Sequence, residues 1–176
     1  NRSLDGNGYN LRAYALKSSI LRHMGNAEEA LKMAAFARQK CDPLDVNLMA
    51  EQWMAAKDPN VAKTLFATMN EHQPTALEVA ASYYNCGLWS DGLALLQQSV
   101  ASAQKKTEVS PIVYYYMGYF AEKLGDNAKA AEYRRQAAIQ SPDYVFPFQD
   151  ELITVLNSAI KANPQDARAP YYLGNL

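Results

Sequence analysis

The sequence has few of the residues that metal and redox sites require. It contains two cysteines and two histidines in 176 residues. Cys41 and Cys86 lie far apart and outside any Cys-x-x-Cys pair, and His23 and His72 fall in different expected helices. Free cysteines are usually small buried side chains, so we expect both thiols to be buried. The sequence therefore predicts no metal site and no cofactor.

Long hydrophobic runs and an excess of charge of one sign are also lacking. No apolar run approaches the roughly 20 residues that cross a bilayer, which argues against membrane insertion. The 17 Lys and Arg residues and the 18 Asp and Glu residues are interspersed and leave a formal net charge of -1. Because a basic stripe is needed to neutralise phosphates, we expect no nucleic acid among the partners.

Motifs of known catalytic sites are missing as well. The sequence has no G-x-S-x-G turn, no Gly-rich phosphate loop and no His-x-x-x-His pair. The acidic pairs Glu28-Glu29 and Asp150-Glu151 stand at expected helix starts, where carboxylates favour the positive end of the helix dipole. We therefore expect a protein that is not an enzyme.

What the sequence does contain is a repeated pattern of small and large residues. Hydrophobic residues make up 49% of the chain, enough for one compact domain or a short solenoid. The pattern is clearest from Pro111 to Pro142 and recurs over 11–43, 44–74 and 75–110. Glycine inside a helix costs about 1 kcal/mol relative to alanine, so Gly118 is expected where two helices cross closely. The positions of the clearest unit are Tyr114, Met117, Gly118, Gly125, Ala130, Ala137 and Pro142.

This pattern resembles the tetratricopeptide repeat (TPR), a two-helix unit of about 34 residues with an aromatic residue, Leu-Gly, small residues and a closing proline. The resemblance implies an all-α fold, a right-handed α-solenoid of antiparallel helix pairs forming a TPR-like superhelix. We expect about nine or ten helices and no sheet. Residues 1–176 should form a single TPR-like domain that ends in an irregular half-unit, 143–164, and a truncated unit, 165–176. The half-unit should hold an extended aromatic connection at 144–148 and a helix at 149–162.

Residues typical of helix ends support these boundaries. Ser110 followed by Pro111 is typical of a helix start, and Thr75 with Glu78 has the spacing of a capping box. A left-handed residue is expected where the first helix of a pair ends. Those positions are Gly25, Gly87 and Gly125.

Both ends of the sequence fit parts of further repeat units, so we expect a fragment of a longer repeat-containing protein. The irregular segment followed by a resumed repeat is similar to the helical tails of some large bacterial proteins, which adds the expectation of a bacterial source. A unit that lacks its partner helix leaves apolar surface uncovered. The chain is therefore expected either to be less stable than a longer version or to self-associate through its C-terminal end.

The repeat register also predicts a binding surface. It places Tyr115 and Tyr119, four residues apart, on the face of a first helix that lines the inner surface of the superhelix. Two interpretations are open for them: contact with a ligand, or packing between neighbouring repeats. The expected partner-binding residues are Arg22, Asn47, Glu51, Tyr84, Asn85, Tyr115, Tyr119 and Glu122.

The resemblance implies a non-catalytic scaffold that binds a protein or peptide ligand in the concave groove. The alternative comes from a different class of protein. It is a helical structural appendage of a larger, carbohydrate-acting bacterial enzyme. The complete reading frame would separate the two, since a β-rich domain with paired carboxylates would favour the appendage.

Overall fold

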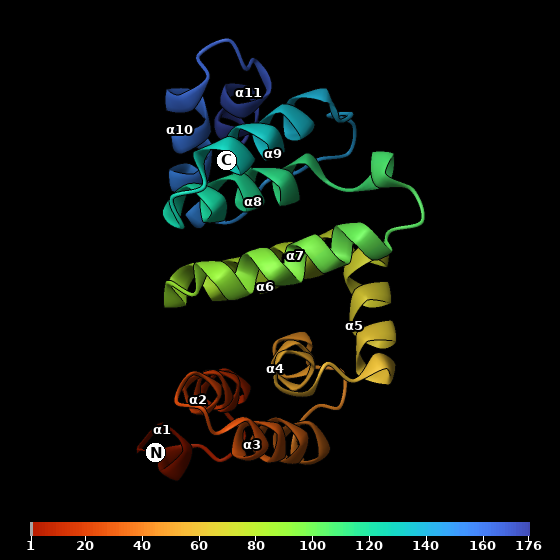
Figure 1. Ribbon diagram of the computed structural model, residues 1–176, viewed down its shortest axis with the longest axis vertical. Coiled ribbons are helices and arrows are strands. Elements are labelled where there is room, and N and C mark those ends of the chain that lie inside the picture. The colour runs from red at the N-terminus through yellow and green to blue at the C-terminus, as the bar shows by residue number, and fades with distance from the viewer. Residues whose placement is uncertain (1) are drawn as a thin grey trace. The chain divides into compact units, whose positions relative to one another are not determined.

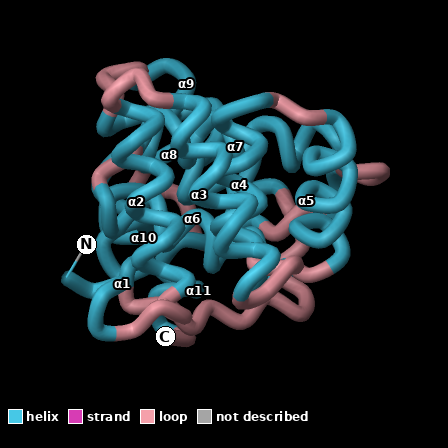
Figure 2. Tube along the Cα trace, turned by 90° about the horizontal axis from the view of Figure 1, so that it is seen from below, coloured by secondary structure: helices cyan, strands magenta, loops and turns pink. Residues whose placement is uncertain are grey.

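The computed structural model describes residues 2–176, a range in which the chain forms eleven α-helices, one 3₁₀-helix and no strand (Figure 1 and Figure 2). The predicted all-α fold is confirmed, with slightly more helices than expected. The elements are α1 (Arg2–Gly6), α2 (Leu11–His23), α3 (Ala27–Lys40), α4 (Val46–Ala56), α5 (Pro59–Glu71), α6 (Gln73–Cys86), α7 (Trp89–Ser102), η1 (Lys106–Glu108), α8 (Pro111–Lys123), α9 (Asn127–Ile139), α10 (Glu151–Ala162) and α11 (Arg168–Gly174).

The chain divides into two compact units, Asn1–Ala67 and Thr68–Leu176, with the boundary inside α5. We call them unit 1 and unit 2. The helices follow one another in pairs with short turns, as in solenoids of TPR-like helix pairs. The single domain expected over 1–176, and its division into repeat units, stay predictions.

Unit 1 is built around α2, α3 and α4, each of which packs against the other two. Tyr14, Ala34, Ala37 and Leu48 form its core, and the two alanines are fully buried. Because α3 presents alanines to its neighbours, the helix axes can approach closely.

Helix α8 is the centre of unit 2. Residues 111–121 are all buried, because α6, α7, α9 and α10 pack around this helix. The predicted close crossing at Gly118 is confirmed. A Cβ atom there would lie 3.0 Å from Cγ of Arg134 and 3.3 Å from the carbonyl oxygen of Ala130, both on α9.

The helix ends agree with the sequence at most positions. Gly25, Gly87 and Gly125 have φ of 82°, 67° and 81°, the left-handed region that glycine adopts without strain. Ser110 Oγ accepts a hydrogen bond from the amide of Ile112 at 3.3 Å, so it caps α8 as predicted.

The capping box predicted at Thr75 and Glu78 is wrong. Helix α6 begins at Gln73 with His72 as its N-cap, two residues before Thr75. Pro74 explains the earlier start, since proline lacks an amide hydrogen and is well tolerated in the first turn of a helix.

Residues 140–150 separate α9 from α10 and contain no helix. In the connection predicted to be extended over 144–148, Tyr144 lies in a turn with φ of 58°, and residues 145–148 form neither helix nor strand. Helix α10 begins two residues later than expected. The burial expected for the cysteines is wrong, because Cys41 is half-buried and Cys86 is exposed. Cys86 is the last residue of α6 and is followed by the left-handed Gly87, at which the helix ends.

Candidate functional site

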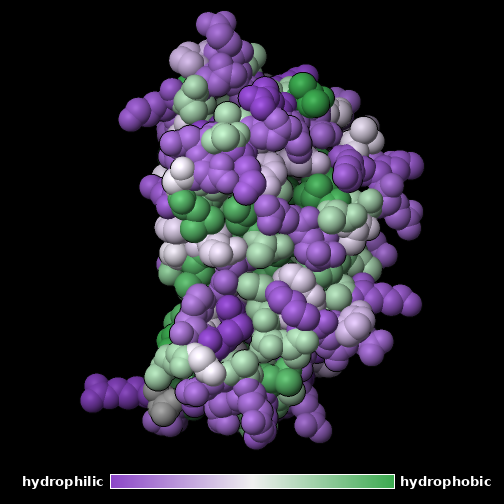
Figure 3. Space-filling view, in the orientation of Figure 1, coloured by the Kyte–Doolittle hydropathy of each residue, from purple (hydrophilic) through white to green (hydrophobic). Residues whose placement is uncertain are grey.

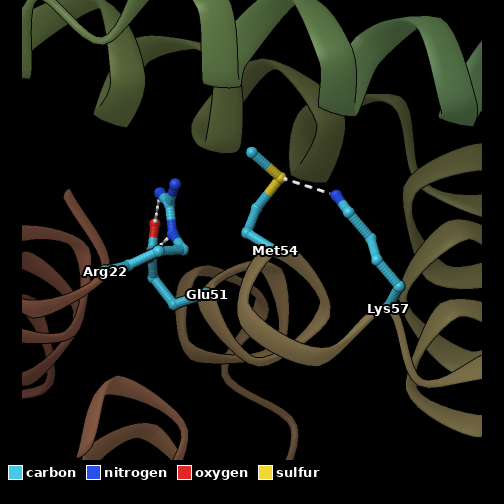
Figure 4. Close-up of polar contacts among 4 residues, drawn as sticks. All are labelled: Arg22, Glu51, Met54 and Lys57. Carbon is cyan, nitrogen blue, oxygen red and sulfur yellow. Dashed lines mark hydrogen bonds and ion pairs between the residues drawn. The ribbon is translucent and has the colours of Figure 1, made fainter. Parts of the chain in front are cut away.

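In unit 1 the structure pairs two of the predicted site residues with each other (Figure 4). Arg22 of α2 donates from Nε to Glu51 Oε2 of α4 at 3.1 Å and from Nη2 to Oε1 at 3.3 Å. The side chains are only 13% and 4% exposed. A two-point pair of this kind fixes the orientation of both groups, and removing either partner would leave a buried charge uncompensated.

Asn47, the third predicted residue of unit 1, lies one turn before Glu51 on α4. Its Oδ1 atom is buried and has no hydrogen-bond partner within the protein. The hydroxyl oxygens of Ser18 and Ser19 on α2, four and three residues before Arg22, are also buried without a partner. A buried polar atom without a partner costs roughly 1–3 kcal/mol. Helices α2 and α4 therefore bury polar groups beside the Arg22–Glu51 pair that joins them only at a cost in stability.

Lys57 joins this region without having been predicted. It ends α4 in the left-handed conformation, with φ of 53°. Its Nζ lies 3.4 Å from Sδ of Met54 (Figure 4). The same Nζ lies 3.5 Å from the centroid of the Trp53 ring. An ammonium group at this distance from an aromatic face is attracted by the ring quadrupole. The only sequence signal was a lysine four residues after a tryptophan.

In unit 2, Tyr84 and Tyr119, both named among the expected partner-binding residues, lie together. Their ring centroids are 5.4 Å apart, and Trp89 of α7 contacts both rings, at 5.7 Å and 5.8 Å. Burial, followed by the hydrogen bond and charge of Tyr84, raises the pKa of Tyr119 to about 12. The Nζ of Lys123 lies 5.0 Å from the Tyr119 ring centroid. Tyr84, Trp89 and Tyr119 therefore form an aromatic cluster, and the ammonium group of Lys123 lies over one of its rings.

Tyr115 faces other partners than Tyr119 does. Its side chain is 1% exposed, and its hydroxyl donates to Asp166 Oδ2 at 2.8 Å. Asp166 Oδ1 in turn accepts from the amides of Arg168 and Ala169, at 2.9 Å and 3.4 Å, and so caps α11. Burial and this hydrogen bond raise the pKa of Tyr115 far above its usual value. Of the two interpretations given for this tyrosine, the geometry favours packing.

Asn85 and Glu122 are each held by polar partners from α10. The Nδ2 of Asn85 donates to Glu151 Oε1 at 2.5 Å. Glu122 accepts hydrogen bonds from Arg134 of α9 and from Ser158 Oγ, the latter at 2.8 Å. Burial alone would raise the pKa of Glu122, but these hydrogen bonds and the guanidinium charge outweigh it, and the pKa lies below its usual value.

Sequence reasoning missed the residues that hold the predicted ones in place. They are Arg134, Glu151, Ser158 and Asp166, and three of them lie beyond the last clear repeat unit. Arg134 had a weak signal, because it stands one turn after Ala130, where α9 crosses Gly118. No signal in the sequence indicated that Glu151 pairs with Asn85, 66 positions away, or that Asp166 pairs with Tyr115, 51 positions away.

Solved structures with a similar course of the chain include two of MamA. One, a MamA RS-1 double mutant, is 15% identical, with 94% of this chain and 91% of that chain covered and a TM-score of 0.40. The other is 16% identical over 90% of this chain and 91% of that chain, with a TM-score of 0.40. The TPR-like repeats of a Podosopora anserina protein described as a kinesin light chain are 16% identical over 95% and 93%, with a TM-score of 0.37. No family model and no curated protein matches the sequence.

The described residues hold no group of three or more His, Cys, Asp or Glu side chains that could bind a metal ion. Between residues 2 and 176, no helix is both long and apolar enough to cross a bilayer. On the face drawn in Figure 3, hydrophobic residues gather in small groups between hydrophilic ones, and neither kind covers that face alone. The surface on view is thus mixed in character.

Proposed function

We propose that this chain is a non-catalytic scaffold that binds a protein or peptide partner in the concave groove of a TPR superhelix. One observation carries the proposal. In unit 2, the C-terminal ends of α6 and α8 present Tyr84, Asn85, Glu122 and Lys123, and hydrogen bonds or ring contacts hold each of them in place. Side chains that are already ordered lose little entropy when they bind.

The predicted residues divide into binding and supporting groups. Tyr115 and Tyr119 are 1% and 5% exposed, so we assign them to the support of the surface rather than to contact with the partner. In unit 1, Arg22 and Glu51 are paired and only 13% and 4% exposed, so we assign them to the support of the surface as well. Asn47 is half-buried, and we propose it as a partner-binding residue whose unpartnered Oδ1 can accept a hydrogen bond from a peptide amide.

A peptide selection tests this proposal. Random peptides displayed on phage are selected against the purified chain, and the affinities of the recovered peptides are measured by fluorescence anisotropy. Changing Tyr84→Ala together with Asn85→Ala should weaken binding about thirtyfold, or ~2 kcal/mol, if these residues are hot spots. Gln98→Ala, an exposed position on α7, is the matched control and should bind as the wild type does. The proposal would be contradicted if the selected peptides bound the double variant as tightly as the wild type, or if the selection recovered no binding peptides.

Self-association through residues 165–176 also stays a prediction. Tyr171 and Leu176 are 52% and 45% exposed there, and both are large and apolar. Sedimentation velocity of the wild type and of Tyr171→Ser tests it. A dimer that the substitution weakens is expected, and a strict monomer at high concentration contradicts the prediction.

A further inference from the structure

The segment between α9 and α10 exposes three aromatic rings in a row. Tyr144, Phe146 and Phe148 are 89%, 78% and 58% exposed. Val145 and Pro147, which alternate with them, are buried. From Val145 onward this alternation is typical of extended backbone, in which successive side chains point to opposite sides. Tyr144 itself lies in the turn that precedes it. The buried pair therefore anchors the segment to unit 2, and the three rings line its outer side. We call these three residues the aromatic strip.

Exposed phenylalanines in a row need a reason, because monomeric proteins rarely leave contiguous apolar groups in water. None of the three rings contacts another aromatic ring among the described residues. A hydrogen bond stabilises the turn before the strip, because Ser141 Oγ donates to Asp143 Oδ2 at 2.8 Å. Tyr144 adopts φ of 58° in this turn. A left-handed conformation is uncommon for a tyrosine. The local structure thus holds the first ring outward.

The charges around the strip are of one sign along the sequence. From residue 136 to residue 160 there are three carboxylates, Asp143, Asp150 and Glu151, and no Lys, Arg or His. Two of these carboxylates already have hydrogen-bond donors, because Asp143 accepts from Ser141 Oγ and Glu151 accepts from Asn85 Nδ2. Asp150, which is exposed, is the carboxylate left to meet an incoming cation.

We propose that the aromatic strip binds an extended peptide that carries arginine at alternate positions. Guanidinium groups stack on aromatic faces and are only weakly hydrated, so they suit exposed rings beside a carboxylate. Arginines at every second position of the peptide match the aromatic rings at every second position of the strip. The residues involved differ from those of the groove described above, so this inference goes beyond the proposed function.

Two synthetic peptides test the proposal by isothermal titration calorimetry with the whole chain. One is Gly-Arg-Thr-Arg-Thr-Arg-Gly and the other has Glu in place of each Arg. The arginine peptide should bind at least tenfold more tightly, and the difference should shrink as salt rises. Changing Tyr144, Phe146 and Phe148 to Ser together should weaken the arginine peptide at least tenfold. Asp150→Asn should weaken it severalfold and reduce the salt dependence.

Matched controls separate the strip from other features. Tyr9→Ser removes a ring that is 67% exposed in unit 1, and Glu28→Gln removes an exposed carboxylate on α3. Both should bind the arginine peptide as the wild type does, and so should Tyr84→Ala, which probes the proposed groove instead. The triple variant changes exposed side chains, and circular dichroism checks that it stays helical.

Three results would overturn the inference. The first is equal binding of the arginine and glutamate peptides. The second is unchanged binding by the triple variant. The third is a dimer that the triple variant loses while the arginine peptide does not bind, because then a second copy of the chain covers the strip.

Discussion

At the scale of single residues, the hydrogen bond from Tyr115 to Asp166 is the most instructive contact. It joins α8 to the cap of α11, and both side chains are buried. Tyr115→Phe should lower the free energy of unfolding by about 1.5–3 kcal/mol, because the acceptor is a carboxylate. Tyr116→Phe is the matched control, since its hydroxyl donates to the neutral Gln149 Oε1 at 3.1 Å, and it should cost about 0.5–1.5 kcal/mol. Urea unfolding measures both, and equal losses would speak against the charge-assisted bond.

The buried tyrosines also predict how stability depends on alkaline pH. Burial raises the pKa of Tyr115 and Tyr116, and that of Tyr119 to about 12, whereas an unfolded tyrosine titrates near 10. Above pH 10 the unfolded chain loses protons that the folded chain keeps, so stability is full below pH 10 and falls as pH rises. Each such tyrosine contributes a slope of about 1.4 kcal/mol per pH unit.

Urea unfolding between pH 9 and pH 12 measures that slope. Tyr119→Phe should make the fall shallower. A free energy of unfolding that stays constant from pH 9 to pH 12 would show that these hydroxyls are not protected by folding.

At the scale of helices, Gly92 of α7 shows how packing overrides helix propensity. Propensity alone would make Gly92→Ala stabilising by about 1 kcal/mol. A Cβ atom there would lie 2.7 Å from Cε2 of Phe120 and 3.1 Å from Cβ of Tyr83, so the crossing has no room for it. We expect a net loss of about 1–3 kcal/mol, measured by thermal melting. Gly6→Ala in α1, where no atom lies within 4 Å, is the control and should not destabilise.

The helices were largely predictable because their signals are local. Gly25, Gly87 and Gly125 mark helix ends through their own backbone freedom, and Ser110 caps α8 through an amide two residues away. The error at Thr75 is also local in origin. The capping-box spacing of Thr75 and Glu78 does not take Pro74 into account. Because proline is well tolerated in the first turn of a helix, α6 begins at Gln73 instead.

At the scale of the whole molecule, the candidate site was predictable only in part. The repeat register placed Tyr84, Tyr119, Arg22 and Glu51 among the expected site residues, but it did not predict the ion pair that Arg22 forms with Glu51. It could not predict that Asp166 would bury the hydroxyl of Tyr115, because residues 143–176 depart from the repeat and their packing has no periodic signal. The same departure leaves the aromatic strip exposed.

The distribution of burial also predicts how stability varies along the chain. Helix α8 is surrounded, with residues 111–121 all buried, whereas α3, of similar length, buries only Ala30, Ala34 and Ala37. Amides in regions dense in buried contacts exchange only through large openings, and those near the surface exchange through small ones. In hydrogen exchange followed by mass spectrometry, peptides from α8 should therefore exchange most slowly, those from α3 faster, and those from α1 and residues 140–150 fastest. Exchange from α8 as fast as from α3 would mean that α8 is not the stable centre of unit 2.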